Sequence, residues 1–358
     1  MISANRQRQQ EWDFVKAVLI IFVVWGHVCS YISDPTYERN LLTSVIRLYQ
    51  MPMFILVSGF FSQPSTSLDS VKITLKKTTI GNIVPYVFWC IIGAITVFVM
   101  NAILSEESRG GITYIFKTVA QESNILWFLG CLILCRIYYA ISSWLSIKIW
   151  HGFFVLAVLL VVFIPKDLWH FSFLYPFFAL GAELRRIDLK RFIGRKWTII
   201  WSFAAIILLI VSWNVPTNYT FYNASNFIFA RGVSTVVYQL TFIIARYALY
   251  GIVTICYLML FLNIYEIIKA HKSIETICYI GRETLGIFLI HIILLYHIVK
   301  PIISTATNNQ GLLMNSTFIR YYLLGSCVTA IAVVISLKIT KMLEMNRITR
   351  SILLGRAK

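Results

Sequence analysis

Long apolar runs recur along the whole chain, and they constrain its fold more than any other feature. A run of about 17 to 25 apolar residues is long enough to cross a bilayer as a helix. Polar, Pro-rich or charged breaks separate the runs, so we expect an all-α polytopic membrane bundle of about ten transmembrane helices. The predicted spans are 14–32, 44–62, 79–101, 124–143, 149–164, 169–185, 197–213, 240–264, 284–305 and 318–339.

The composition excludes a soluble globular protein. Of the 358 residues, 58% are hydrophobic and 13% are charged, whereas soluble domains are about 45–50% apolar and 25% charged. No small-residue cleavage site follows the first run, so we do not expect a cleaved signal peptide. The connecting segments are shorter than an independent fold, the longest outer loop being 102–123, and we expect one membrane domain over residues 1–358.

Lys and Arg residues are unevenly divided between the two sets of connecting segments. Most of them fall on the side of the amino-terminal arm, and the other side carries Arg39, Arg109, Lys117 and Lys166. Cytoplasmic loops are enriched in Lys and Arg, so both termini are expected in the cytoplasm and the number of spans is even. The formal charge of +17 is therefore mainly a topology signal, and no nucleic-acid partner is expected.

The first span places ionisable groups where lipid is expected. Its sequence from Asp13 to His27 is DFVKAVLIIFVVWGH. Lys16 and His27 fall on one helix face, roughly 16.5 Å apart along the axis. A charge inside a bilayer costs about 2.5–3.5 kcal/mol, so such a residue suggests a functional site. The alternative is a histidine satisfied by a neighbouring helix.

This stretch resembles the first span of the membrane acyltransferase-3 family, in the branch similar to fucose 4-O-acetylases, through its D-x-x-K and G-H elements. The second span supports the resemblance. There YQMPMFILVSGFF, from Tyr49 to Phe61, is similar to the family's aromatic-His-Met-Pro-x-Phe-x-x-x-Ser-Gly-Phe block, with Gln50 where histidine is common.

Further segments extend the resemblance in the same order along the chain. Gly81 and Asn82 stand where the family often has another arginine, and Phe288 replaces a usual tyrosine. The matching segments are 72–89 before and within the third span, 127–128 in the fourth, 175–186 with its Pro-Phe-Phe motif, and 279–291 ending at His291.

The resemblance implies a multi-pass protein of the bacterial inner membrane that moves an acyl group, commonly acetyl, from cytoplasmic acyl-coenzyme A to a hydroxyl. The acceptor would be a cell-surface glycan or a lipid-linked saccharide. Acetyl-CoA would be the co-substrate, and no metal is implied. Histidine ionises near neutral pH, so His27 suits a general base, and it could instead carry the acyl group covalently.

Basic groups at the cytoplasmic face would suit the polyanionic nucleotide end of coenzyme A. Lys16, Lys76 and Lys77 are the candidates for this role. Asp13 is expected either to pair with Lys16 at i, i+3 or simply to begin the helix with a negative charge.

A further set of residues is expected to bind the acceptor. For Arg47, at the outer face, the alternative is interface snorkelling. The stretch 227–264 is too long for one ordinary span, and we expect a surface or re-entrant helix at 227–238 followed by one long span, which leaves its arginines facing an outer cavity. The candidates are Arg47, Gln50, Arg231, Arg246 and His291.

The remaining charged residues and thiols carry bland interpretations. Glu183 is expected to pair with Arg185 or Arg186, and Glu283 with Arg282, at the cytoplasmic edge. The seven cysteines lie in or beside spans and predict neither a disulfide framework nor a zinc site.

Two rival functions remain. A transporter or flippase for a lipid-linked saccharide would explain the spans but not the ordered motifs. A membrane sensor without chemistry would leave Lys16 and His27 unexplained.

Overall fold

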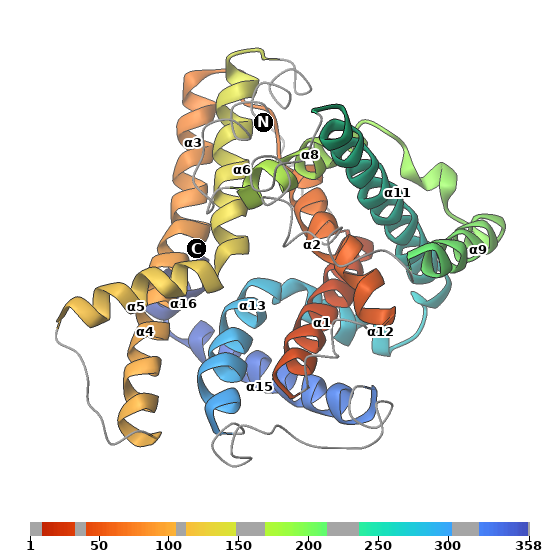
Figure 1. Cartoon of the computed structure of the whole chain (residues 1–358). Coiled ribbons are helices and arrows are strands. Elements are labelled where there is room, and N and C mark those ends of the chain that lie inside the picture. Colours follow the sequence, from red (N-terminus) through yellow and green to blue (C-terminus); the bar gives the residue numbers. More distant parts are fainter. Residues whose placement is uncertain are drawn as a thin grey trace.

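The computed structural model describes residues 9–32, 41–104, 112–147, 169–212, 236–302 and 322–356, and the regular structure in this part of the chain is entirely helical (Figure 1). The short elements η2 and η7 are π-helical and η4 is a 3₁₀ helix. The elements are α1 (Gln10–Ile32), α2 (Leu41–Phe61), α3 (Leu68–Thr78), η2 (Thr79–Ile83), α4 (Val84–Leu104), α5 (Ile112–Ile125), α6 (Trp127–Trp144), α8 (Trp169–Leu184), η4 (Leu189–Phe192), α9 (Arg195–Ser212), α11 (Val236–Ile268), α12 (Ser273–Arg282), α13 (Thr284–Ile292), η7 (Ile293–Val299), α15 (Gly325–Met345) and α16 (Arg347–Leu354).

The predicted all-α membrane fold is confirmed. Six helical stretches in the described residues are long and apolar enough to cross a membrane. The predicted span 149–164 lies outside the described residues, and each of the other predicted spans coincides with a described helix. α11 is one continuous helix of 33 residues, in agreement with the expected long span after 238.

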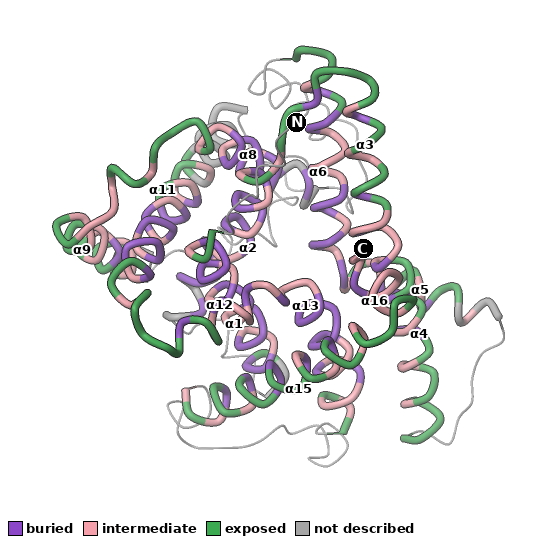
Figure 2. Tube along the Cα trace, turned by 180° about the vertical axis from the view of Figure 1, so that it is seen from behind, coloured by how far each residue is buried: buried purple, intermediate pink, exposed green. Residues whose placement is uncertain are grey.

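Large apolar side chains cover the periphery of the bundle. Ile95 and Phe98 on α4, and Ile199 and Phe203 on α9, are exposed. Burial is concentrated in α1, α2, α8 and α13, whereas α9 and the far half of α4 are mostly exposed (Figure 2). An apolar surface of this extent is suited to lipid rather than water, and the protein is an integral membrane protein.

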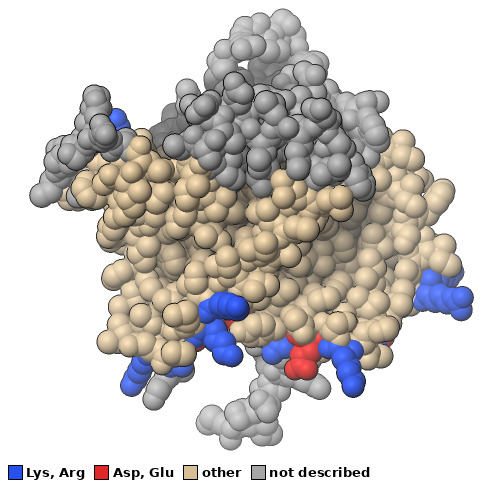
Figure 3. Space-filling view, turned by 90° about the horizontal axis from the view of Figure 1, so that it is seen from below, with Lys and Arg blue, Asp and Glu red and all other residues tan. Residues whose placement is uncertain are grey.

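Charged side chains avoid this apolar belt. Seen from below, Lys and Arg gather along one edge of the molecule, with the few acidic side chains among them (Figure 3). We call the end of the bundle at which Lys16, Arg282 and Arg356 line one cavity the inner end. The opposite end of α1, which carries His27, is the outer end.

Glycines allow two central helices, α2 and α8, to touch backbone to backbone. A Cβ at Gly59 of α2 would lie 1.9 Å from the carbonyl oxygen of Phe178 on α8, and one at Gly181 of α8 would lie 1.9 Å from that of Leu56. Small residues permit this close approach of membrane helices. The contact fixes α2, and with it the wall of the site described below.

The expected outer loop 102–123 contains a helix. α5 occupies Ile112–Ile125 and packs against α4. The segment contains too few apolar residues for a span, but its buried Glu122 meets a partner on η7, which tethers it to the bundle.

Candidate functional site

α1 carries the two groups singled out in the sequence, at opposite depths. Lys16 Nζ lies 2.7 Å from Asp13 Oδ1, so the predicted i, i+3 ion pair is present, and Asp13 is buried. A Cβ at Gly281 would lie 1.7 Å from the Asp13 carbonyl oxygen. α12 therefore rests directly on the backbone of the turn that holds this ion pair.

His27 meets a second histidine across the bundle. The ring centroids of His27 and His291 are 5.4 Å apart, which places the two imidazoles in contact. His291 is fully buried and its Nδ1 lies 2.8 Å from the carbonyl oxygen of Ile287. A backbone carbonyl only accepts, so Nδ1 carries the hydrogen and Nε2 keeps its lone pair.

The second nitrogen of His291 is unusual. Nε2 is buried and has no hydrogen-bond partner among the described residues. A buried polar atom without a partner is costly, and such atoms are concentrated at functional sites. The structure therefore joins two residues that the sequence named separately and places an unused proton acceptor beside His27.

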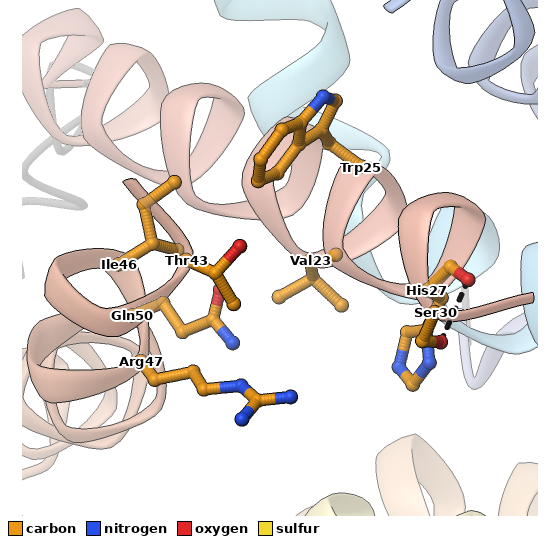
Figure 4. Close-up of a pocket in the computed structure, with 9 residues that line it drawn as sticks. Val23, Trp25, His27, Ser30, Thr43, Ile46, Arg47 and Gln50 are labelled. Atoms are coloured by element: carbon orange, nitrogen blue, oxygen red, sulfur yellow. Dashed lines mark hydrogen bonds between the residues drawn. The ribbon is translucent and has the colours of Figure 1, made fainter. Parts of the chain in front are cut away.

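His27 borders a small polar cavity at the outer end, which we call the outer cavity. Its volume is about 130 Å³. Arg47 and Gln50 extend from α2 toward the side of α1 that carries Val23 and His27 (Figure 4). Gln50 Oε1 and Thr43 Oγ1 are buried without hydrogen-bond partners among the described residues, so this cavity offers polar groups to a ligand.

A larger cavity, the inner cavity, opens on the other side of the same helices. Its volume is about 400 Å³. The deep part is apolar and aromatic, whereas the inner end is basic. Its lining includes the aromatic residues Phe54, Phe128 and Phe288 and the cationic residues Lys16, Arg136, Arg282 and Arg356.

Val23 lines both cavities, so they approach each other from opposite ends of the membrane at one level of α1. Aromatic contacts continue from the inner cavity to the histidines. The Phe128 and Phe288 rings are 5.7 Å apart, and the Phe288 and His291 rings are 5.9 Å apart. The histidine pair thus lies between the outer cavity, which His27 lines, and Phe288, which lines the inner cavity.

The basic groups of the inner cavity differ from those expected from the sequence. Lys16 lines the cavity, whereas Lys76 and Lys77 are exposed on α3 and do not line it. Arg136 takes part instead, and its Nη1 donates to Asn82 Oδ1 at 2.8 Å. Asn82 lies in the π-turn η2, at a position where the family often has an arginine. This polar residue within an apolar span could have indicated a polar partner such as Arg136.

The remaining acceptor candidates are only partly placed. Arg231 and the side chain of Arg246 lie outside the described part of the structure. Arg47 and Gln50 both line the outer cavity, and His291 lies beside it through its contact with His27.

The expected edge ion pairs have two outcomes. Glu183 Oε2 accepts from Arg186 Nη1 at 3.2 Å, as predicted. The prediction for Glu283 is wrong, because it pairs with the distant Arg356 rather than with its neighbour Arg282. Helix packing brings α16 to the end of α12, and a sequence-local rule could not include this contact.

The sequence also missed a buried pair outside the two cavities. Glu122 Oε2 of α5 and His297 Nε2 of η7 lie 2.8 Å apart, and both side chains are buried. A Cβ at Gly93 of α4 would lie 2.4 Å from the same carboxylate oxygen, so this glycine makes room for it.

The thiols show no sign of reactivity. The described cysteines are free and all but Cys327 are buried. Burial raises the pKa of the Cys278 thiol, which lies at the inner edge of the bundle, and the nearby Asp13 carboxylate raises it further. In the described part of the chain, His, Cys, Asp and Glu form no cluster of three or more that could hold a metal ion.

Comparison with known proteins agrees with this geometry. Residues 9–337 match the model of the acyltransferase 3 family, described as an acyltransferase domain. The chain belongs to the acyltransferase-3 family. The match covers the lining of the outer cavity and that of the inner cavity except Leu354, Gly355 and Arg356.

Relatives are distant. The chain is 20% identical to nodulation protein NolL of Mesorhizobium japonicum over 221 residues, which cover 59% of this chain and 55% of the relative. It is 22% identical to NolL of Sinorhizobium fredii over 225 residues, which cover 60% of each. The chain thus spans a little over half the length of these relatives. No solved structure matches the chain.

Proposed function

We propose that this membrane acyltransferase moves an acetyl group from cytoplasmic acetyl-CoA to a hydroxyl of a surface glycan or lipid-linked saccharide. The observation that carries the proposal is the pair of cavities that share Val23, with His27 lining the outer one and in contact with His291. The donor and the acceptor can then enter from opposite ends, and neither has to cross the membrane.

The inner cavity suits an acyl-CoA. Its cations lie at the inner end, where they match the phosphates of the nucleotide, and its aromatic depth suits the slender pantetheine arm. An arm in this cavity would bring the thioester to the level of Val23. Lys16, held by Asp13, belongs to the basic entrance.

The outer cavity suits a hydroxylated acceptor. Gln50, Thr43 and Arg47 supply donors and acceptors for sugar hydroxyls around His27. A hydroxyl bound there would attack the thioester carbonyl carbon. His27 would take the hydroxyl proton, the carbon–sulfur bond would break, and the proton would pass to the departing thiolate. The products are an ester and free coenzyme A.

His291 would orient His27 for this step. Its Nε2 lone pair can accept the N–H of His27, and the second nitrogen of His27 would then act as the base.

The test is acetylation by cells and by purified protein. Wild-type protein is expected to incorporate label from acetyl-CoA into surface glycans, detected by mass analysis. His27→Ala should lower the rate by about 10²–10⁴-fold, the contribution of a positioned general base. His271→Ala is the matched control, because His271 is exposed and lies outside both cavities.

Two results would overturn the proposal. One is normal acetylation by a correctly inserted His27→Ala variant. The other is movement of a lipid-linked saccharide across vesicle membranes by wild-type protein that transfers no acetyl group, which would favour the flippase alternative.

A further inference from the structure

The segment that follows α15 forms part of the inner cavity wall. The Asn346 side chain accepts from the Ile348 backbone N–H at 2.8 Å and caps α16. Leu354 is buried, and Trp89 Nε1 of α4 donates to the Leu353 carbonyl oxygen at 2.8 Å. The helix is thus anchored at both ends against the bundle.

A left-handed residue then turns the chain into the cavity. Gly355 has φ +63°, a conformation that strongly favours glycine. A Cβ there would also lie 2.4 Å from the Gly81 carbonyl oxygen in η2. This close contact directs Arg356 toward the inner cavity, which Leu354, Gly355 and Arg356 all line.

Two carboxylates hold Arg356 in this position. Its Nη2 lies 2.5 Å from Glu283 Oε2, and its Nη1 is paired with Glu344 Oε1. Glu283 is buried, whereas Glu344 is partly exposed. Glu283 also follows Arg282, which lines the same cavity. Arg356 is therefore a fixed cation at the inner entrance and not a mobile surface side chain.

The other arginines of the cavity have no such partners. Among the described residues, no carboxylate lies within ion-pair distance of Arg136 or Arg282, and the Nε atoms of both are buried without hydrogen-bond partners. Three guanidinium groups thus line one cavity, two of them without a counter-charge. Guanidinium groups bind phosphate through paired, charge-assisted hydrogen bonds.

We propose that Arg356, held by Glu283 and Glu344, binds a phosphate group of the acyl donor together with Arg136 and Arg282. This inference rests on the proposed function, because it assumes a phosphorylated donor in the inner cavity. It assigns donor binding to a segment whose residues lie beyond the family match at 337.

The experiment compares the binding of two probes to the purified full-length protein by calorimetry. Coenzyme A carries the nucleotide phosphates, and pantetheine carries only the arm. Arg356→Ala should weaken coenzyme A binding by about tenfold, as expected for a lost charge-assisted hydrogen bond. Pantetheine binding should stay the same. Arg356→Lys should bind coenzyme A more tightly than Arg356→Ala, because lysine keeps the positive charge but lacks the paired N–H donors of the guanidinium group.

Arg347→Ala is the matched control, since Arg347 is an exposed arginine on α16, the helix that precedes Arg356, and lies outside the cavity. If Arg356→Ala does not fold, Arg356→Lys alone decides, and coenzyme A affinity equal to wild type overturns the inference. Unchanged affinity in Arg356→Ala overturns it as well. Failure of wild-type protein to bind coenzyme A overturns the proposed donor itself, and thus differs from failure of the arginine assignment.

Discussion

Two buried histidines on one helical run, His291 and His297, differ in the partners of their ring nitrogens. His291 ends α13 and His297 lies in η7, and both are buried. His297 Nε2 is hydrogen-bonded to the Glu122 carboxylate at 2.8 Å, and both side chains are buried. His291 donates to a backbone carbonyl and keeps an unused Nε2 beside His27 and the outer cavity.

His291 and His297 are the same residue type and are both buried, so they differ in their hydrogen-bond partners. A carboxylate fixes an imidazole and occupies its nitrogen, so the pair stabilises the contact between α5 and the helical run. A lone pair without a partner is instead available to a neighbouring group. The π-turn η7 contributes to this difference, because the wider turn shifts the face on which later residues lie, and such turns are frequent at functional sites.

The largest expected effect tests the structural half of this comparison. Glu122→Ala removes one partner of a buried pair and should lower the free energy of unfolding by about 3–5 kcal/mol, measured by thermal denaturation in detergent. Acetyl transfer per folded molecule should stay within a few-fold of wild type. Glu275→Ala, at an exposed glutamate of α12, is the control and should change neither quantity. A strong loss of activity with normal stability would show that the two histidine sites are not distinct.

The next effect tests the chemical half. His291→Asn keeps a donor near the Nδ1 position for the Ile287 carbonyl and removes the Nε2 acceptor. The transfer rate should fall by about 100-fold, the low end for positioned proton-transfer groups. The melting temperature should change little.

His291→Gln is the companion variant, because its amide reaches the Nε2 position. It should keep more activity than His291→Asn. Equal activity of His291→Asn and wild type would mean that Nε2 has no role and that His291, like His297, is a packing residue.

The smallest expected effect tests how tightly the bundle packs around the Glu122–His297 pair. Gly93→Ala places a Cβ 2.4 Å from Glu122 Oε2 and should lower stability by about 1–3 kcal/mol through overpacking. Gly251→Ala is the control, since nothing lies within 4 Å of a Cβ there. The same measurement should then show unchanged or slightly higher stability. A neutral Gly93→Ala would mean that the space around Glu122 is not tightly packed.

The sequence predicted those features that local pattern encodes. Apolar runs marked the helices, the i, i+3 spacing marked the Asp13–Lys16 pair, and the family motifs marked His27 and His291. Contacts between distant segments were beyond it. Glu122 belongs to a stretch too polar for a span, and nothing local shows that it reaches η7. Arg356 meets Glu283 only because α16 folds back on the inner end of the bundle.

The positions of Lys16 and His27 along the axis of α1 were predictable, but the helices that face them were not. The rise per residue gave the distance between Lys16 and His27. Which helix would face each of them depends on close contacts such as Gly281 on Asp13, which no periodicity reveals. The expected roles of Lys76 and Lys77 were based on charge alone, and the described cavity is lined by arginines from other helices instead.

The position of Val23 between the two cavities also has an electrical consequence. Each cavity, when filled with water or a ligand, would carry the electrical potential of its own compartment into the bundle. A membrane voltage would then fall mainly across the layer of protein around Val23 that separates the two cavities. Moving one charge through a voltage of 100 mV involves about 2.3 kcal/mol. We expect this layer to act as an insulator against ion leakage, and an apolar, branched side chain at residue 23 fits that requirement.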